Sequence, residues 1–258
     1  MAIGKEEYFE NDELKIYRGE DFIVSKHIKI HQPTLNDICD YGEQEYYSMI
    51  YQLTATPQTM KAQLWDMGVD YTTITPYELF YLFLYKLYPK ERTSIIFGDL
   101  DFQKFQLVQG KDNNEIELSQ IVQTDEGIDE VELDEFTYNM IMDYLRKVHI
   151  IEKDERIPAN ESTKMILIED AKDEIEKNKN KEYHSQLQNL ISSMVNSEGF
   201  KYNHSQVWDM KINAFMDSVK RISKIKNAEL LLQSGYSGYG IDLKDVDKKQ
   251  LDWLGELE

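Results

Sequence analysis

The feature that most constrains this sequence is an apolar run placed directly after a helix-start signal. Thr75 precedes a proline and is followed three residues later by Glu78, which is the pattern of a capping box with proline at the first helical position. From Tyr77 to Tyr85 the chain is then apolar on almost every helical face. A helix of this kind has to be buried on most of its sides. The run therefore predicts a helix at the centre of the N-terminal core.

Other local signals predict further helices on both sides of this run. A second threonine-proline pair at Thr56 predicts a helix that ends at Gly68, and the central helix should end before Pro89. Thr34 with an acidic residue three positions on predicts a helix, or a broken pair of helices, over 34–54. A glycine at position 42 is the expected place of a break.

Two stretches have the residue pattern of β-strands instead. Residues 14–30 are rich in Ile, Val, Tyr and Phe and predict two short strands or a hairpin. Residues 94–122 predict a small β-hairpin around the turn GKDNN. The acidic segment TDEGIDEVELDE is then expected to form a mobile loop, followed by a helix over 134–148. The predicted fold class is mainly α with small β-hairpins (α+β), with an N-terminal mixed domain and a helical C-terminal region.

Charge divides the chain unevenly. The net charge is −19, and residues 1–150 carry 28 acidic and 13 basic side chains, whereas residues 151–258 carry 20 and 16. A dense charge run with a proline marks residues 151–182 as a connector with an exposed helix. The predicted division is an acidic α+β domain over 1–150, this charged connector, and a helical region over 183–258.

The clearest helical pattern lies in the C-terminal region. Asn203 and Gln206 form a plausible capping box at its start. Five apolar residues then recur with spacings of 4, 3, 4 and 3, a seam that must face another helix. They are Trp208, Ile212, Phe215, Val219 and Ile222. Two interpretations remain open: the seam packs inside its own domain, or it is covered by a partner or a sister subunit.

A turn-rich tail follows, with one short helix signal at Asp247. Tyr236, Tyr239 and Trp253 are large aromatic residues in a segment too short to have a core of its own. They dock either on the domain or on another molecule. Together with the seam, these aromatic residues are the candidate partner-binding residues of the sequence.

No pattern of catalytic, metal-binding or cofactor-binding residues was found. The five histidines form no zinc motif, no glycine-rich phosphate loop or nucleophile elbow is present, and no acidic cluster has the spacing of a calcium loop. The acidic balance argues against nucleic acid as a partner, since such binding depends on Lys and Arg. No apolar run reaches the length of about 18 residues that a membrane span needs. We expect a protein that is not an enzyme, has no cofactor and works by binding other proteins.

The single cysteine fits the same expectation. Cys39 cannot form an internal disulfide, which is typical of a reducing compartment, and its place on a predicted helix indicates a small buried residue. With no secretory h-region at the N-terminus, the sequence predicts a cytosolic protein.

Two blocks of the sequence resemble known proteins. They are IHQPTLNDICDYGEQEYYSMIYQLTATPQTMKAQLWDMGVDYTTITPYELF, and VWDMKINAFMDSVKRISK followed by GYSGYGIDLKDVDKKQLDWLGEL. Both resemble proteins from the structural-gene clusters of tailed bacteriophages of Gram-positive hosts, the first through its entry into the helical part and the second through a helix with a tail ending in LDWL. Within such clusters, an acidic, helical, non-enzymatic protein looks most like a tail assembly chaperone.

That resemblance implies a factor in the host cytoplasm that holds the tape measure protein soluble, recruits tail tube subunits and is absent from the finished virion. The alternative is a structural component of the virion, such as a baseplate or connector subunit, which would form symmetric homo-oligomers. Co-purification with tail proteins, or presence in purified particles, separates the two.

Overall fold

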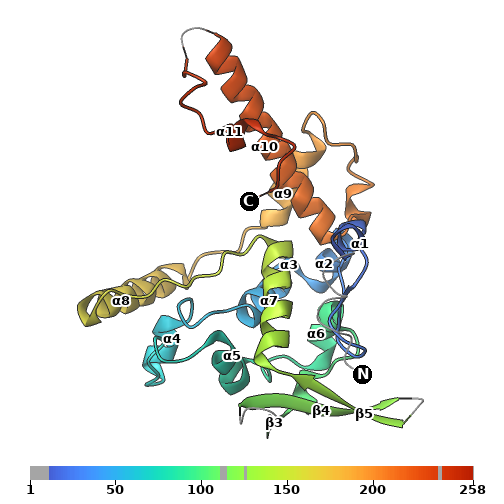
Figure 1. Ribbon diagram of the computed structural model, residues 1–258, viewed down its shortest axis with the longest axis vertical. Helices are drawn as coiled ribbons and strands as arrows, with labels where there is room; N and C mark the ends of the chain where they lie inside the picture. Colours follow the sequence, from blue (N-terminus) through green and yellow to red (C-terminus); the bar gives the residue numbers. More distant parts are fainter. Residues whose placement is uncertain (1–11, 111–114, 125–126, 238–239, 258) are drawn as a thin grey trace.

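The computed structural model describes residues 12–110, 115–124, 127–237 and 240–257. The fold is α+β, as predicted, with two small antiparallel sheets and a helical C-terminal region. Figure 1 shows a broad lower part, a helix that reaches out to one side, and a C-terminal projection that rises from the top. In the following, the body means residues 12–149 and the arm means residues 223–257.

The helices of the body surround the predicted central run. They are α1 (Asp12–Arg18), α2 (Leu35–Tyr41), α3 (Glu43–Leu53), α4 (Lys61–Asp66), α5 (Pro76–Leu79), α6 (Lys90–Phe97) and α7 (Glu135–His149). A π-helical turn, η1 (Phe80–Leu84), continues α5, and a short 3-10 turn, η2 (Phe102–Lys104), follows α6.

Two small sheets complete the body. The first pairs β1 (Phe22–Ile23) with β2 (Lys29–Ile30). The second has the strand order β3 (Gln106–Gln109), β4 (Ile116–Thr124) and β5 (Gly127–Leu133), all antiparallel. Leu118 lies opposite Leu133 in this sheet, and both side chains are buried in the core. The other face, which carries Ile121 and Ile128, is exposed.

Local capping explains why the helices begin where they do. Thr75 Oγ1 accepts a hydrogen bond from the backbone N–H of Glu78 (3.1 Å), and the Glu78 carboxylate accepts one from the N–H of Thr75 (2.7 Å). Thr34 and Asp37 form the same reciprocal pair at the start of α2. Gly42, at φ 100°, separates α2 from α3, so the predicted break is confirmed.

The central run lies in the core, with one exception. Tyr77, Leu79, Phe80 and Leu84 are buried, and the Phe80 ring contacts that of Tyr138 on α7 with ring centroids 5.0 Å apart. Leu82 faces solvent, because five successive helical residues cannot all point into one core. The packing of α5 and η1 against α7 holds the body together.

Several predicted elements were wrong in type. Residues 14–18 belong to helix α1, and residues 94–97 belong to α6, where Thr93, Ile96 and Phe97 are buried at helical spacing. The acidic segment expected to be a loop contains β5, because seven ladder pairs with β4 satisfy its backbone groups. The turn at 111–114 lies outside the described residues.

Two smaller corrections concern single residues. Thr56 does not start a helix: it closes a turn with Thr59, whose hydroxyl accepts from the Thr56 N–H (3.0 Å), and α4 begins only at Lys61. Cys39 is exposed rather than buried, because it lies on the outer face of α2.

Beyond the body, the chain is held by fewer apolar contacts. Helix α8 (Glu161–Asn178) follows a stretch without helix or strand over 151–158 and lies against α4. Lys164 forms an ion pair with Asp70 (2.8 Å), and this salt bridge lowers the pKa of the Asp70 carboxyl to about 2. Ile168 is buried beside it. Residues 173–178, at the C-terminal end of α8, are exposed, and the helix as a whole projects at the left of Figure 1.

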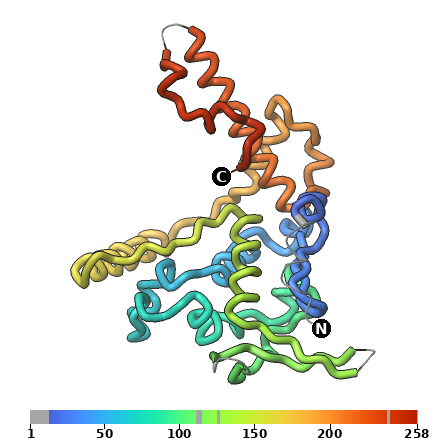
Figure 2. Tube along the Cα trace, viewed as in Figure 1, coloured from blue at the N-terminus to red at the C-terminus, as the bar shows by residue number. Residues whose placement is uncertain are grey.

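The C-terminal region consists of α9 (Gln186–Val195), the short turn η3 (Val207–Asp209), the long helix α10 (Ile212–Tyr236) and α11 (Lys248–Leu251). Figure 2 shows α10 leaving the body and the last residues returning alongside it. The domain boundaries predicted at 150 and 182 stay predictions.

Candidate interaction surface on the C-terminal helices

The lower part of α10 belongs to the core of the protein. Ile212 and Phe215 are 0% exposed. The backbone N–H of Ile212 donates to the carbonyl of Pro33 (2.9 Å), and that of Leu35 donates to the carbonyl of Met210 (3.0 Å). These bonds join the start of α10 to the start of α2, so these two seam residues have no area left for a partner.

Trp208 is not on the same helix as the rest of the predicted seam. It lies half-buried on η3, because the chain becomes extended at Lys211, where it pairs with the body, before α10 begins. The predicted capping box does form: the N–H of Asn203 donates to Gln206 Oε1 (3.1 Å), and the N–H of Gln206 donates to Asn203 Oδ1 (3.1 Å). It caps this short turn and not α10.

Val219 and Ile222 mark the upper edge of the core. Both are half-buried and pack against the main hydrophobic cluster. Beside them, Tyr17 of α1 lies near Asp217, and burial together with this carboxylate raises the pKa of the tyrosine. The seam residues therefore pack mainly against other parts of the same chain, and this packing ends at about Ile222.

The arm presents large apolar side chains to solvent. Tyr236 is 80% exposed and Trp253 47%, whereas Tyr239 lies outside the described residues. The sequence reading missed Leu230 (65% exposed) and Leu254 (73%). Leu230 is the first of three consecutive leucines, so the sequence does not show which of them faces solvent, and Leu254 stands beside Trp253.

A strap, defined here as residues 252–257, runs back along α10. The guanidinium of Arg221 donates to the carbonyls of Trp253 (2.6 Å) and Gly255 (2.8 Å). Lys224 Nζ donates to the carbonyl of Glu256 (2.6 Å). Two basic side chains of α10 thus hold the strap through its backbone.

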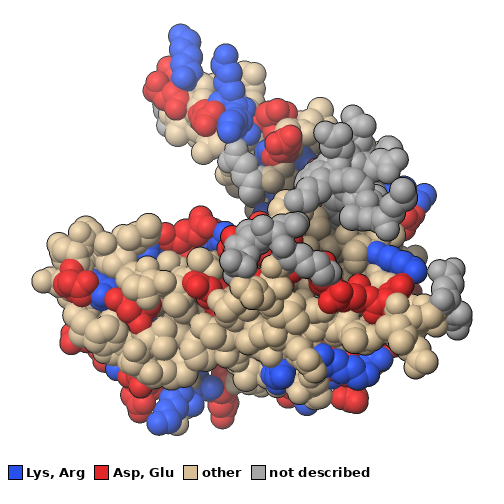
Figure 3. Space-filling model, turned by 60° about the horizontal axis from the view of Figure 1, so that its bottom comes forward, with Lys and Arg blue, Asp and Glu red and all other residues tan. Residues whose placement is uncertain are grey.

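Close packing joins the upper part of α10 to the returning chain. A Cβ placed on Gly235 would collide with the side chain of Leu243. Ala228, two turns earlier on the same face of α10, is buried. Figure 3 shows basic and acidic side chains close together on the arm at the top of the view.

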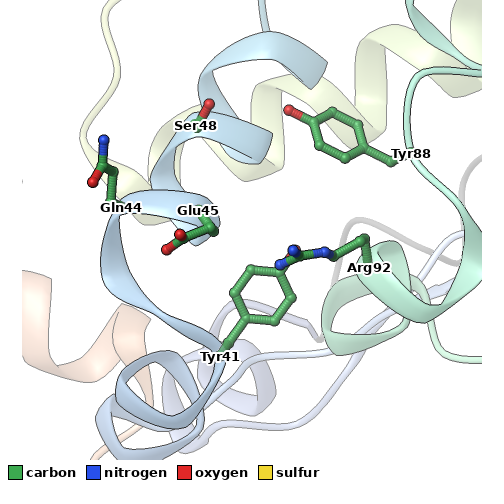
Figure 4. A pocket seen from close by; sticks show the side chains of 6 residues that line it. All are labelled: Tyr41, Gln44, Glu45, Ser48, Tyr88 and Arg92. Atoms are coloured by element: carbon green, nitrogen blue, oxygen red, sulfur yellow. The ribbon is translucent and has the colours of Figure 1, made fainter.

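The body also has a recess, between α3 and the start of α6. It has a volume of about 300 Å³ and is lined by Tyr41, Gln44, Glu45, Ser48, Tyr88 and Arg92. The Arg92 guanidinium lies over the Tyr41 ring, 5.4 Å from its centroid (Figure 4). Both charged side chains are exposed, so the recess could accept a polar side chain of a partner but does not enclose a small molecule.

Within the described ranges, no group of three or more His, Cys, Asp or Glu residues could hold a metal ion. None of the helices in these ranges is both long enough and apolar enough to cross a membrane.

Comparison with protein-family models gives a match in the C-terminal region. The protein is an α+β body with a helical C-terminal extension. The family model of the YomV second domain matches residues 177–258, in this extension. That family is derived from phages similar to Bacillus phage SPbeta, which agrees with the predicted phage origin. No curated protein and no solved structure matches the chain. The matched residues begin at the end of α8 and include α9, α10, the arm and the strap.

Proposed function

We propose that this phage protein works in virion assembly by binding other proteins, as a tail assembly chaperone for tape measure and tail tube proteins. In this proposal it has no catalytic activity, acts in the host cytoplasm and leaves before the virion is complete. One observation carries the proposal: the region similar to a phage domain is the region that projects from the body with exposed apolar side chains.

The arm supports a binding role in two ways. Leu230, Tyr236 and Leu254 are more than half exposed although they are large and apolar, so each offers apolar surface that a partner protein can bury. The arm also carries five basic and six acidic side chains, whereas the body is strongly acidic. The arm therefore lacks the strong negative charge of the body, which would repel an acidic partner.

Co-purification with tape measure and tail tube fragments tests the proposal. Leu230→Asp with Tyr236→Asp should weaken capture of a fragment at least tenfold. Ile121→Asp with Ile128→Asp is the matched control, because these residues are also exposed but lie on the body sheet, and it should leave capture unchanged.

The alternative is a structural subunit of the virion. Detection of the protein in purified particles would contradict the chaperone proposal and favour the subunit. A tape measure gene directly downstream would favour the chaperone. Equal loss of capture in both double variants would show that the arm is not the binding region.

A further inference from the structure

We propose that the face of α10 around Arg221 and Lys224 binds an extended acidic segment of a partner protein, and that the strap occupies this face in the free protein. This role goes beyond the proposed function, because it concerns how the strap is held on α10 and does not depend on which protein displaces it.

The contacts of the strap are of a kind that another peptide can replace. Arg221 and Lys224 donate to the carbonyls of residues 253, 255 and 256 at 2.6 to 2.8 Å. Every acceptor is a backbone oxygen, which any extended segment can provide. The donors carry full charges, so their hydrogen bonds are stronger than those between neutral groups.

The side chains of the strap are only partly buried. Leu254 is 73% exposed and Trp253 47%, so much of their apolar surface stays in solvent when the strap is closed. The hydrogen bonds of the two basic residues are open to solvent or only partly buried. A segment held mainly by such bonds can be displaced by a competitor with the same backbone geometry.

Charge identifies the occupant. Between residues 220 and 224 the helix carries Lys220, Arg221 and Lys224 and no acidic residue, in a chain whose net charge is −19. The strap that now lies there contains Asp252 and Glu256. The face therefore fits an extended segment with acidic side chains, and a basic segment would meet repulsion.

A peptide-binding measurement tests this inference. The probe is a fluorescein-labelled peptide of residues 252–258, DWLGELE, added to a chain that ends at Leu251, with binding followed by fluorescence anisotropy. We expect saturable binding at least tenfold tighter than to the full chain, in which the tethered strap competes at high effective concentration. Equal binding by the two chains would overturn the proposal.

Paired variants of the shortened chain test the contacts. Arg221→Gln with Lys224→Gln should weaken binding at least tenfold. Lys201→Gln with Lys226→Gln removes the same charge without touching the strap, since Lys226 bonds Ser197 and Lys201 is exposed, and it should change binding less than threefold. An equal loss in both pairs would mean nonspecific charge attraction and overturn the inference.

Peptide variants test the chemistry of the occupant. A peptide with the changes W253A and L254A should bind within threefold of the original, because the backbone is what Arg221 and Lys224 contact. A peptide with lysine in place of its three acidic residues should not bind. Binding of the lysine peptide, or loss with the alanine peptide, would contradict the proposed recognition.

The full chain provides a second measurement that does not require the shortened chain to fold. In the variant Arg221→Gln with Lys224→Gln, amide hydrogens of residues 253–257 should exchange at least tenfold faster than in the Lys201→Gln, Lys226→Gln control. Unchanged exchange would overturn the proposal. Capture of tail protein fragments is a separate readout, so failure here leaves the proposed function standing.

Discussion

The body and the arm are stabilised by different means. The body has one continuous hydrophobic core, in which Phe80, Tyr138 and many other large side chains are excluded from solvent. In the described part of residues 223–257, only Ala228 is buried. The arm instead depends on helix formation and on hydrogen bonds from Arg221 and Lys224 to the strap. Because burial is cooperative and exposed polar contacts are local, the arm should open while the body stays folded.

The largest effect is expected where α10 enters the core. Phe215→Asp should destabilise the protein by about 4 kcal/mol or more, because it removes a fully buried ring and places a carboxylate in an apolar site. Chemical denaturation measures the loss. Leu230 lies later on the same helix and is exposed, so Leu230→Asp should change the free energy of unfolding by less than about 0.5 kcal/mol. Similar losses in both variants would break the distinction between body and arm.

The second effect is a pH dependence that belongs to the body. His149 is buried; its Nδ1–H donates to the Leu145 carbonyl (2.7 Å), so Nε2 accepts from the Tyr46 hydroxyl (2.7 Å). Burial lowers the pKa of His149 to about 4 from its ordinary 6.5. The unfolded chain therefore takes up this proton first, and stability is full above pH 6.5 and falls as the pH drops towards 4.

The loss from this histidine should be about 2 kcal/mol between pH 7 and pH 5. His149→Gln should be less stable at pH 7 and should lack this part of the pH slope. Denaturation curves at the two pH values give the comparison. A variant with the full slope of the native chain would exclude His149 as the cause.

A third comparison uses the same cap chemistry in both regions. Thr75→Ala removes the capping box of α5 and should lower global stability by about 1 kcal/mol. Asp247→Ala removes the cap of α11, whose side chain accepts from the Lys249 N–H (3.0 Å). It should speed amide exchange in α11 but leave the denaturation midpoint of the body unchanged. A shifted midpoint would mean that the arm unfolds together with the body.

The smallest global effect is expected from Gly235→Val. The new side chain would collide with Leu243, so the returning chain has to move away from α10. Amide exchange over 241–251 should rise severalfold, with a change in midpoint corresponding to less than about 0.5 kcal/mol. Gln233→Val provides a control on an exposed position of the same helix, and it should leave the exchange of this segment unchanged.

Sequence patterns predicted the helical part of the fold better than the surface. The seam at Ile212, Phe215, Val219 and Ile222 was found, but its spacing is the same whether its cover is the chain itself or a partner. The structure shows that the body covers the first two residues completely. Tyr236 and Trp253 were singled out and are exposed, yet their role in binding remains a prediction. The strap had no signal in the sequence, since its acceptors are backbone carbonyls.

The sequence by itself determined where several helices begin or break. Thr34, Thr75 and Asp247 cap helices, and Gly42 interrupts one, because each of these effects joins atoms only a few residues apart. Tertiary structure decided the rest. Strand β5 forms because β4 satisfies its backbone, α10 begins at Ile212 because Pro33 accepts its N–H, and the strap closes because Arg221 reaches residues 253 and 255. Such bonds join distant parts of the chain, and no local pattern records them.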